Sequence, residues 1–275
     1  MHIWWRLVGV FVFFTWNRIN YLTHEDVDYT EYLGTNDQVP LGASIGRRRK
    51  LAAEGRHAEQ EEDENCNPAL YVCNHHGFLE VVTMHILLHP SFVAKYEISR
   101  EPFIGAMAKA LQCIFVHRTN QDQKNTILES IERRQIEIED KRLPYTPLTI
   151  FPEGTTTHGK HLIPFKRGAF ESMRTCVPCV HKFSYCHHSP TWETISVPDC
   201  IIMWLCHPGF CLSTLEMLPP FVPNQYMLDT HADKGASEWE IYAWCIRDIM
   251  RKRGNYELSD VSHREKLEYE KWLRK

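Results

Sequence analysis

The feature that most constrains the fold is an alternation of short apolar runs with stretches of helical periodicity. From residue 69 onward these segments predict strands at 69–73, 92–98, 113–116 and 148–151, and helices at 79–88, 102–111 and 122–140. Further apolar runs occupy residues 176–183 and 201–205. Strands separated by helices predict an α/β fold, with a mostly parallel central sheet flanked by helices.

The chain is long enough for one such domain, because 43% of its 275 residues are hydrophobic. A long helix is predicted at 237–253, with Ser237 as its N-cap and Gly254 as its stop signal. Residues 261–273 predict a charged terminal helix. We therefore expect one domain over 68–256 and a charged helical extension over 257–275.

The first 22 residues are hydrophobic and rich in tryptophan. The apolar stretch from Leu7 to Trp16 is short for a transmembrane helix, which needs about 20 apolar residues. Trp4 and Trp5 suit a membrane interface, because the indole ring is amphipathic. We expect residues 1–22 to form a membrane-associated segment, with a core helix of a soluble protein as the alternative.

Residues 23–67 are predicted to be a polar, flexible linker or insertion. The segment contains the basic run 47–50 and an acidic run over 59–64. The basic run is suited to contact anionic head groups, although a solvated charged loop explains it equally well.

Composition disfavours two other classes of protein. The net charge of −4 gives no overall attraction to nucleic acid. The ten cysteines are irregularly spaced, which favours reduced thiols over a disulfide framework. Cys176 and Cys179 form a C-x-x-C motif, but residues three apart on a buried strand point to opposite faces. We therefore expect no metal site and no cofactor.

The loop at 74–80 follows a predicted strand and contains His75 and Glu80. A histidine can deprotonate a hydroxyl near neutral pH, and a carboxylate can orient its ring and stabilise the imidazolium. The pair can meet only if His75 lies in the loop and Glu80 in the first turns of the following helix. A structural histidine at a strand end is the alternative interpretation.

Two further loops follow predicted strands. Arg118 follows the strand at 113–116. Its guanidinium can bind a phosphate through two hydrogen bonds, or it can form a surface salt bridge. The loop at 151–160 combines Glu153, a glycine and three threonines, which suits a polar ligand or a tight turn. Downstream, Lys166 and Arg167 precede a predicted helix, an arrangement suited to phosphate or CoA binding.

Taken together and in this order, the loops resemble the glycerolipid acyltransferase family, which includes the lysophosphatidic acid acyltransferases. The family's N-H-x4-D block, its arginine block, its F-P-E-G-T block and its strand proline match Asn74 to Glu80, Ile114 to Arg118, Phe151 to Thr155 and Pro178. The matches cover about residues 70–223. The sequences of 153–160 and 165–170 look most like the lysophosphatidylcholine and lysophosphatidylethanolamine acyltransferases.

Three residues depart from the family pattern. Glu80 replaces the usual aspartate, so His75 must sit slightly differently. The glycine expected ahead of Arg118 is missing. His158 stands where that subgroup usually has asparagine, which affects contacts with the acceptor's head group.

The resemblance implies an acyl-CoA-dependent lysophospholipid acyltransferase, with acyl-CoA as co-substrate and no cofactor or metal. It implies His75 as general base and Glu80 as the carboxylate that orients it. The implied substrate-binding residues are Asn74, Phe115, Arg118, Phe151, Pro152, Glu153, Gly154, Thr155, Lys166, Gly168 and Pro178.

The family also implies membrane association, in the endoplasmic reticulum, with the site open to cytosolic acyl-CoA. A thioesterase or lipid hydrolase is the rival enzyme, although the one G-x-S-x-G match, Gly42 to Gly46, lies in the predicted polar linker and not between a predicted strand and a predicted helix. A catalytically silent lipid-binding homologue is the alternative outside enzymes. The sequence does not specify the acceptor's head group or the oligomeric state.

Overall fold

The computed structural model describes most of the chain after residue 67 and part of what precedes it. The described residues are 6–12, 15–24, 27–35, 68–101, 104–116, 121–140, 143–186, 189–191, 195, 199, 202–203 and 209–273. Arg118 and the two charged runs of the predicted linker lie outside these ranges.

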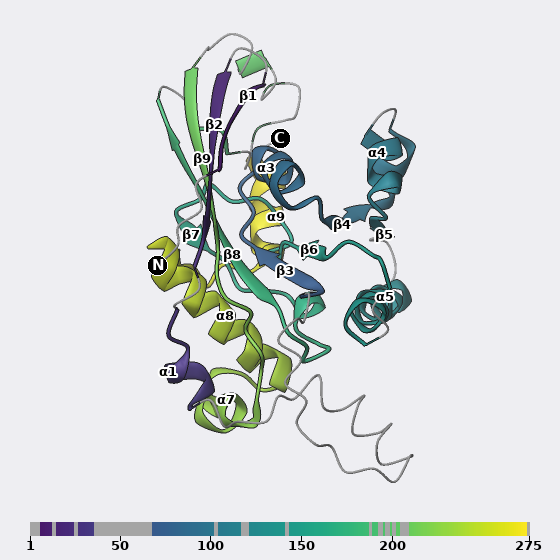
Figure 1. Cartoon of the computed structure of the whole chain (residues 1–275), viewed down its shortest axis with the longest axis vertical. Coiled ribbons are helices and arrows are strands. Elements are labelled where there is room, and N and C mark those ends of the chain that lie inside the picture. The colour runs from purple at the N-terminus through teal and green to yellow at the C-terminus, as the bar shows by residue number, and fades with distance from the viewer. Residues whose placement is uncertain are drawn as a thin grey trace.

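An eight-stranded sheet forms the centre of the molecule, in the order β1-β2-β9-β8-β3-β6-β4-β5 (Figure 1). Its strands are β1 (Arg6–Val12), β2 (Thr15–Thr23), β3 (Leu70–Cys73), β4 (Ser91–Lys95), β5 (Ile114–Val116), β6 (Leu148–Ile150), β8 (Val177–Tyr185) and β9 (Gly209–Met217). Among the described strands, only the β1-β2 and β8-β9 pairs are antiparallel. The predicted mostly parallel sheet is therefore confirmed.

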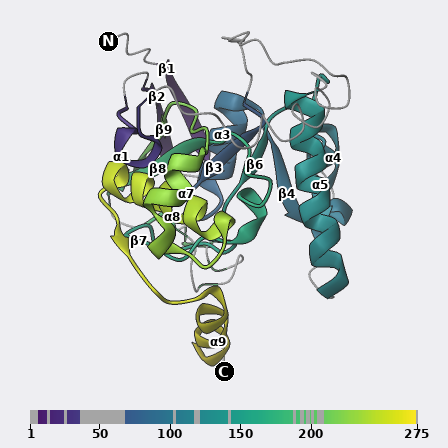
Figure 2. The ribbon, with the colours of Figure 1, turned by 90° about the horizontal axis from the view of Figure 1, so that it is seen from below.

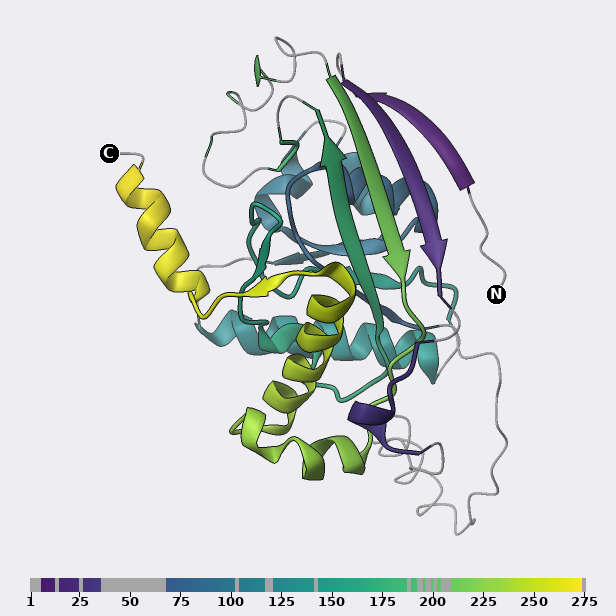
Figure 3. The ribbon, with the colours of Figure 1, turned by 90° about the vertical axis from the view of Figure 1, so that its left-hand side faces the viewer.

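Helices lie on both faces of this sheet. The α-helices are α1 (Thr30–Leu33), α3 (Leu79–Leu88), α4 (Ile104–Ala110), α5 (Gln121–Glu139), α7 (Gln225–Thr230), α8 (Glu238–Gly254) and α9 (His263–Leu273). Short 3-10 turns are η1 (Tyr96–Arg100), η2 (Arg167–Ala169) and η3 (Ala232–Lys234). The short strands β7 (His161–Leu162) and β10 (Glu257–Leu258) pair with each other, and α9 then projects from the body (Figures 2 and 3).

Alternation along the strands divides the core between the two faces. On β3, Leu70 and Val72 join a cluster with residues of α5 and α8, whereas Cys73 joins a second cluster with Met84 of α3. Successive side chains of a strand point to opposite faces. Helices α5 and α8 therefore cover one face of the sheet, and α3 covers the other.

The hydrophobic N-terminal segment forms two strands. β2 lies parallel to β9 over its whole length, and β1 pairs with β2 at the edge of the sheet. The alternative of a core helix is wrong for residues 6–12 and 15–23, because a short apolar run of aromatic and β-branched residues also suits a strand. Among the described residues, no helix has both the length and the apolar character needed to cross a membrane.

Part of the predicted linker belongs to the core. Tyr32 is buried, and its hydroxyl donates to Asp248 Oδ2 of α8 at 2.6 Å. The Tyr29 hydroxyl donates to the carbonyl of Pro219 at 3.0 Å. The segment around α1 is thus held against α8 by contacts that a polar composition does not reveal.

Helix α8 begins as predicted and ends one residue later. Ser237 and Glu240 form a reciprocal capping box at its start. The helix includes Gly254, and the left-handed cap is Asn255, with φ of 53°. Gly254 is needed for a different reason, because a Cβ there would overlap the ring of Tyr256.

One other predicted strand is shorter in the structure, and the apolar run at 201–205 is partly helical. The strand predicted at 92–98 ends at Lys95, where the chain enters η1. Within the run 201–205, residues 202 and 203 are helical, and the rest lies outside the described residues. Short apolar runs do not distinguish strand from helix.

Candidate active site

His75 and Glu80 meet where β3 gives way to α3. His75 lies in the connecting loop and Glu80 is the second residue of α3, which is the placement that the pair requires. The imidazole Nδ1 of His75 lies 2.5 Å from Oε1 of Glu80. A hydrogen bond at Nδ1 selects the tautomer in which Nε2 carries the lone pair.

Glu80 is fully buried and accepts further hydrogen bonds at the same oxygen. The backbone N–H groups of His76 and Gly77 donate to Oε1 at 2.8 and 2.6 Å. Burial opposes ionisation of the carboxyl, but the hydrogen bond from His75 and the nearby histidine charges outweigh it and lower the pKa of Glu80 to about 2. Glu80 therefore carries a negative charge at neutral pH.

The ring of His75 is held from one side and open on another. It stacks on Phe151, with ring centroids 4.2 Å apart and an angle of 15° between the planes. Its side chain is 21% exposed, and Nε2 has no hydrogen-bond partner among the described residues. A hydroxyl group can therefore approach Nε2 while Glu80 holds Nδ1.

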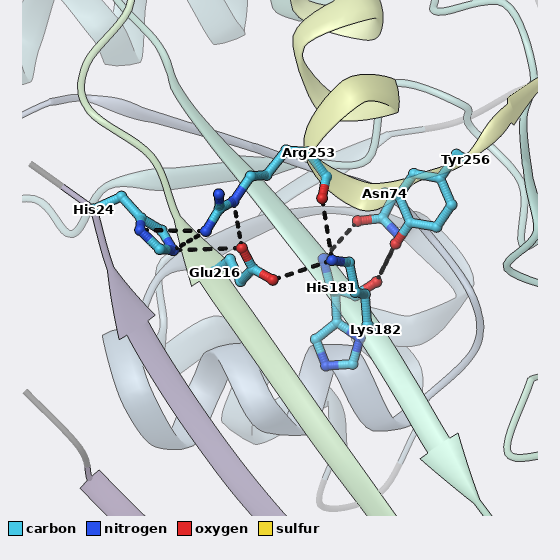
Figure 4. Close-up of polar contacts among 7 residues, drawn as sticks. All are labelled: His24, Asn74, His181, Lys182, Glu216, Arg253 and Tyr256. Carbon is cyan, nitrogen blue, oxygen red and sulfur yellow. Dashed lines mark hydrogen bonds and ion pairs between the residues drawn. The ribbon is translucent and has the colours of Figure 1, made fainter. Parts of the chain in front are cut away.

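Asn74 ties the loop to β8 and to the segment after α8. Its Oδ1 accepts from the backbone N–H of His181 at 2.8 Å, and its Nδ2 lies 2.9 Å from the carbonyl of His181 and 3.1 Å from the Tyr256 hydroxyl (Figure 4). Nδ2 is also 2.7 Å from Nε2 of His76. Asn74 is fully buried, so these contacts fix the backbone next to His75.

Glu153 connects the 151–160 loop to the same backbone. Its Oε1 accepts from the N–H of His75 at 2.9 Å, and its Oε2 accepts from the N–H of Ile163 at 3.4 Å. The backbone N–H of Thr157 also donates to the carbonyl of His75, at 2.8 Å. Glu153 is fully buried, and burial raises its pKa to about 8.

Comparison with known proteins places this arrangement in a family. A family model described as Acyltransferase matches residues 56–192. The lysophospholipid acyltransferase LPEAT1 of Arabidopsis thaliana is 32% identical over 214 residues, which are 77% of this chain and 50% of the relative. The lysophosphatidylcholine acyltransferase of Drosophila melanogaster is 27% identical, covering 80% of this chain and 38% of the relative. This chain belongs to the glycerolipid acyltransferase family.

The chain spans half or less of the length of these curated relatives. Among solved structures, the 1-acyl-sn-glycerophosphate acyltransferase PlsC of Thermotoga maritima aligns with a TM-score of 0.43 and 15% identity. That alignment covers 72% of this chain and 69% of PlsC.

The structure brings most of the acyltransferase motif residues around His75. Phe151 stacks on its ring, and the carbonyl of Pro152 accepts from the N–H of Lys166 at 2.8 Å. Gly154 has φ of +68°, and the ammonium of Lys166 lies where a Cβ of that residue would project. Gly154 is therefore favoured by its backbone conformation, whereas the flexible side chain of Lys166 could move away from a Cβ. Thr155 follows it in the same turn.

Other predicted substrate-binding residues lie elsewhere. Phe115 is on the edge strand β5, which β6 and β4 separate from β3. Pro178 is buried within β8, paired with Val72, and its carbonyl accepts from the N–H of Leu218 at 3.0 Å. Gly168 lies in η2, against Ile131 of α5. The described contacts give these residues places in the fold and do not link them to His75.

Two residues of this candidate site were missed by sequence reasoning. His181 supplies both backbone contacts to Asn74, and Tyr256 donates to the carbonyl of His181 at 2.6 Å. Neither residue lies in a recognised motif.

Among the described residues, no cluster of three or more His, Cys, Asp or Glu side chains is placed to hold a metal ion.

The raised pKa of Glu153 predicts how the stability of the protein varies with pH. The folded state keeps the carboxyl protonated up to about pH 8, whereas an unfolded glutamate loses its proton near pH 4.5. The stability from this group is therefore complete below pH 4.5 and is lost as pH rises to 8. Wild type should lose on the order of 2 kcal/mol relative to Glu153→Gln between pH 5 and 8.

Urea unfolding of both proteins at pH 5, 6.5 and 8 measures this difference. Glutamine cannot ionise, so it serves as the permanently neutral reference with nearly the same shape. A stability difference that stays constant over this range would show that Glu153 is ionised throughout.

Proposed function

We propose that the protein transfers an acyl group from acyl-CoA to the free hydroxyl of a lysophospholipid. The observation that carries the proposal is the His75–Glu80 pair, whose Nδ1 to Oε1 contact leaves Nε2 available to a hydroxyl. The relatives' names, lysophospholipid and lysophosphatidylcholine acyltransferase, support the class of acceptor.

The proposed reaction needs one base and one orienting carboxylate. Nε2 of His75 takes the proton as the acceptor oxygen attacks the carbonyl carbon of the thioester. A carbon–oxygen ester bond forms, the carbon–sulfur bond breaks, and the imidazolium returns the proton to the CoA thiolate. Glu80 stabilises the imidazolium, because its lowered pKa keeps it ionised throughout this cycle. No covalent enzyme intermediate is required.

The surrounding loops are proposed to orient the acceptor. Lys166 lies beside the Gly154 turn, where a cation can contact the acceptor's phosphate. Arg118 has the same proposed role and lies outside the described residues. Glu153 acts differently in this proposal, because its fully buried carboxyl holds the His75 backbone and so positions the base.

A lysophospholipid acceptor also implies a membrane surface. We propose membrane association in the endoplasmic reticulum, with the site open to cytosolic acyl-CoA and with lysophosphatidylcholine or lysophosphatidylethanolamine as acceptor. The sequence of residues 153–160 and 165–170 supports this choice of head group.

The direct test is release of CoA from oleoyl-CoA by membranes containing the protein, measured with a panel of lysophospholipids. We expect release only when an acceptor is present, with a matching amount of diacyl phospholipid formed. Release that ignores the acceptor would instead identify a thioesterase. No release with any acyl donor, under conditions where the folded protein is verified, would identify a silent lipid-binding homologue.

A further inference from the structure

An open hollow of about 390 Å³ lies where β8, the 151–160 loop and the end of α8 meet. Its wall is formed by residues from these three segments: Gly159, Lys160, Lys182, Phe183, Ser184, Gly254, Asn255, Tyr256 and Glu257. None of the roles assigned above to the acyl-transfer site uses this hollow.

The hollow is rich in hydrogen-bond donors. Among the described residues, the ammonium of Lys160 has no side-chain or backbone partner. Lys182 uses two of the three donors of its ammonium, to Glu216 Oε1 and to the carbonyl of Arg253, both at 3.1 Å. The third donor of Lys182, the hydroxyl of Ser184 and the amide of Asn255 are further donors on the wall.

The acidic groups near the hollow are already paired. Glu216 is shared between Lys182 and Arg253, whose Nε donates to its Oε2 at 2.6 Å (Figure 4). Glu257 Oε2 lies 2.8 Å from Nε2 of His161. The carbonyl of Arg251 accepts from the N–H groups of Asn255 and Tyr256, which follow α8. The wall itself carries two cations, Lys160 and Lys182, and one carboxylate, Glu257, whose partner His161 is charged only when protonated.

The hollow touches both neighbours of the proposed base. Tyr256 forms part of its wall, and the hydroxyl of the same residue is bonded to Asn74 at 3.1 Å. On the other side, a Cβ at Gly159 would lie 3.2 Å from the ring of His76. Tyr256 and Asn74 therefore lie between the hollow and His75 on one side, and Gly159 and His76 lie between them on the other.

We infer that this hollow binds the phosphate group of a substrate, with Lys160 and Lys182 as its cationic ligands. The two lysine cations and the other N–H and O–H donors of the wall suit a phosphate, which needs both. The inference rests on the proposed function, since either the acyl-CoA or the lysophospholipid brings phosphate to the site.

Calorimetric titration of the full chain with adenosine 3′,5′-bisphosphate, glycerol 3-phosphate and inorganic phosphate tests this inference. Lys160→Glu should weaken binding of the phosphate probe by about ten-fold or more, because a charge-assisted hydrogen bond is replaced by repulsion. Lys160→Met should have a smaller effect in the same direction. Lys109→Glu is the matched control, since Lys109 is an exposed lysine on α4.

The probes distinguish the two sources of phosphate. A selective effect of Lys160→Glu on adenosine 3′,5′-bisphosphate assigns the hollow to the acyl donor, and a selective effect on glycerol 3-phosphate assigns it to the acceptor. The inference is overturned if wild type binds no probe, or if Lys160→Glu weakens binding no more than Lys109→Glu does. Binding is measured without turnover, so Lys160-dependent binding by a chain that transfers no acyl group would refute only the proposed function.

Discussion

Replacing His75 with alanine is expected to lower the turnover of acyl transfer by about 10²- to 10⁴-fold, the usual contribution of a positioned general base. Nε2 is the atom that the structure leaves available to a hydroxyl, and Nδ1 is committed to Glu80. The effect should fall on kcat more than on KM, because the proton moves only in the transition state. Initial rates with oleoyl-CoA and the preferred lysophospholipid measure it.

Loss of the fold does not explain this expected result. The side chain of His75 is partly exposed, and Glu80 keeps the N–H groups of His76 and Gly77 as donors when the imidazole is removed. Circular dichroism of the variant should therefore match wild type. His231→Ala is a suitable control, since His231 lies beside Trp244 in a different part of the fold. A His75→Ala variant with near-normal turnover would rule out the general-base assignment.

Glu80→Gln is expected to lower turnover by about 100-fold or more, while keeping the shape of the site. The glutamine oxygen can still accept from His75 Nδ1 and from the backbone N–H groups of His76 and Gly77. It cannot supply the negative charge that stabilises the imidazolium. The predicted loss of turnover therefore measures the effect of the negative charge. Single-turnover measurements at saturating substrate separate this effect from an effect on substrate binding.

The stability of wild type relative to Glu80→Gln provides an independent test. The pKa of Glu80 lies below its ordinary value, so its stabilising effect is complete above pH 4.5 and is lost as pH falls towards 2. The difference between the two proteins should thus be constant from pH 5 to 8. A difference that changes over this range would show that Glu80 titrates there. Glu80→Asp completes the series, because it keeps the charge but shortens the reach to His75.

The contrast between these two buried glutamates could not be read from the sequence. Glu80 and Glu153 both follow strands by a few residues, and both are fully buried. Glu80 accepts from a histidine that can itself carry positive charge, which lowers the pKa of Glu80. The hydrogen bonds described for Glu153 come from backbone N–H groups, and burial dominates its pKa. Motif spacing predicts where each glutamate lies in the chain, but it does not predict whether the glutamate is protonated.

The N-terminal segment is one place where the local sequence pattern does not predict the fold. The apolar stretch at residues 7–16 suits a membrane-associated segment, a core helix or a strand, and the pairing of β1 with β2 and of β2 with β9 makes residues 6–12 and 15–23 strands. Tyr29 and Tyr32 likewise join the core from a segment predicted to be a linker. In both cases the deciding partner lies about 190 residues or more further along the chain.

The sequence by itself determined the order of strands and helices from residue 69 to residue 151, the loops that carry polar residues, and the pairing of His75 with Glu80. These features depend on periodicity and on residues a few positions apart, so a short stretch of chain encodes them. Only the tertiary structure decided that Glu153 holds the His75 backbone from 78 residues away, and that Tyr256 reaches Asn74 across 182 residues. Burial and such long-range contacts arise when distant segments pack together, and no local pattern specifies which segments will meet.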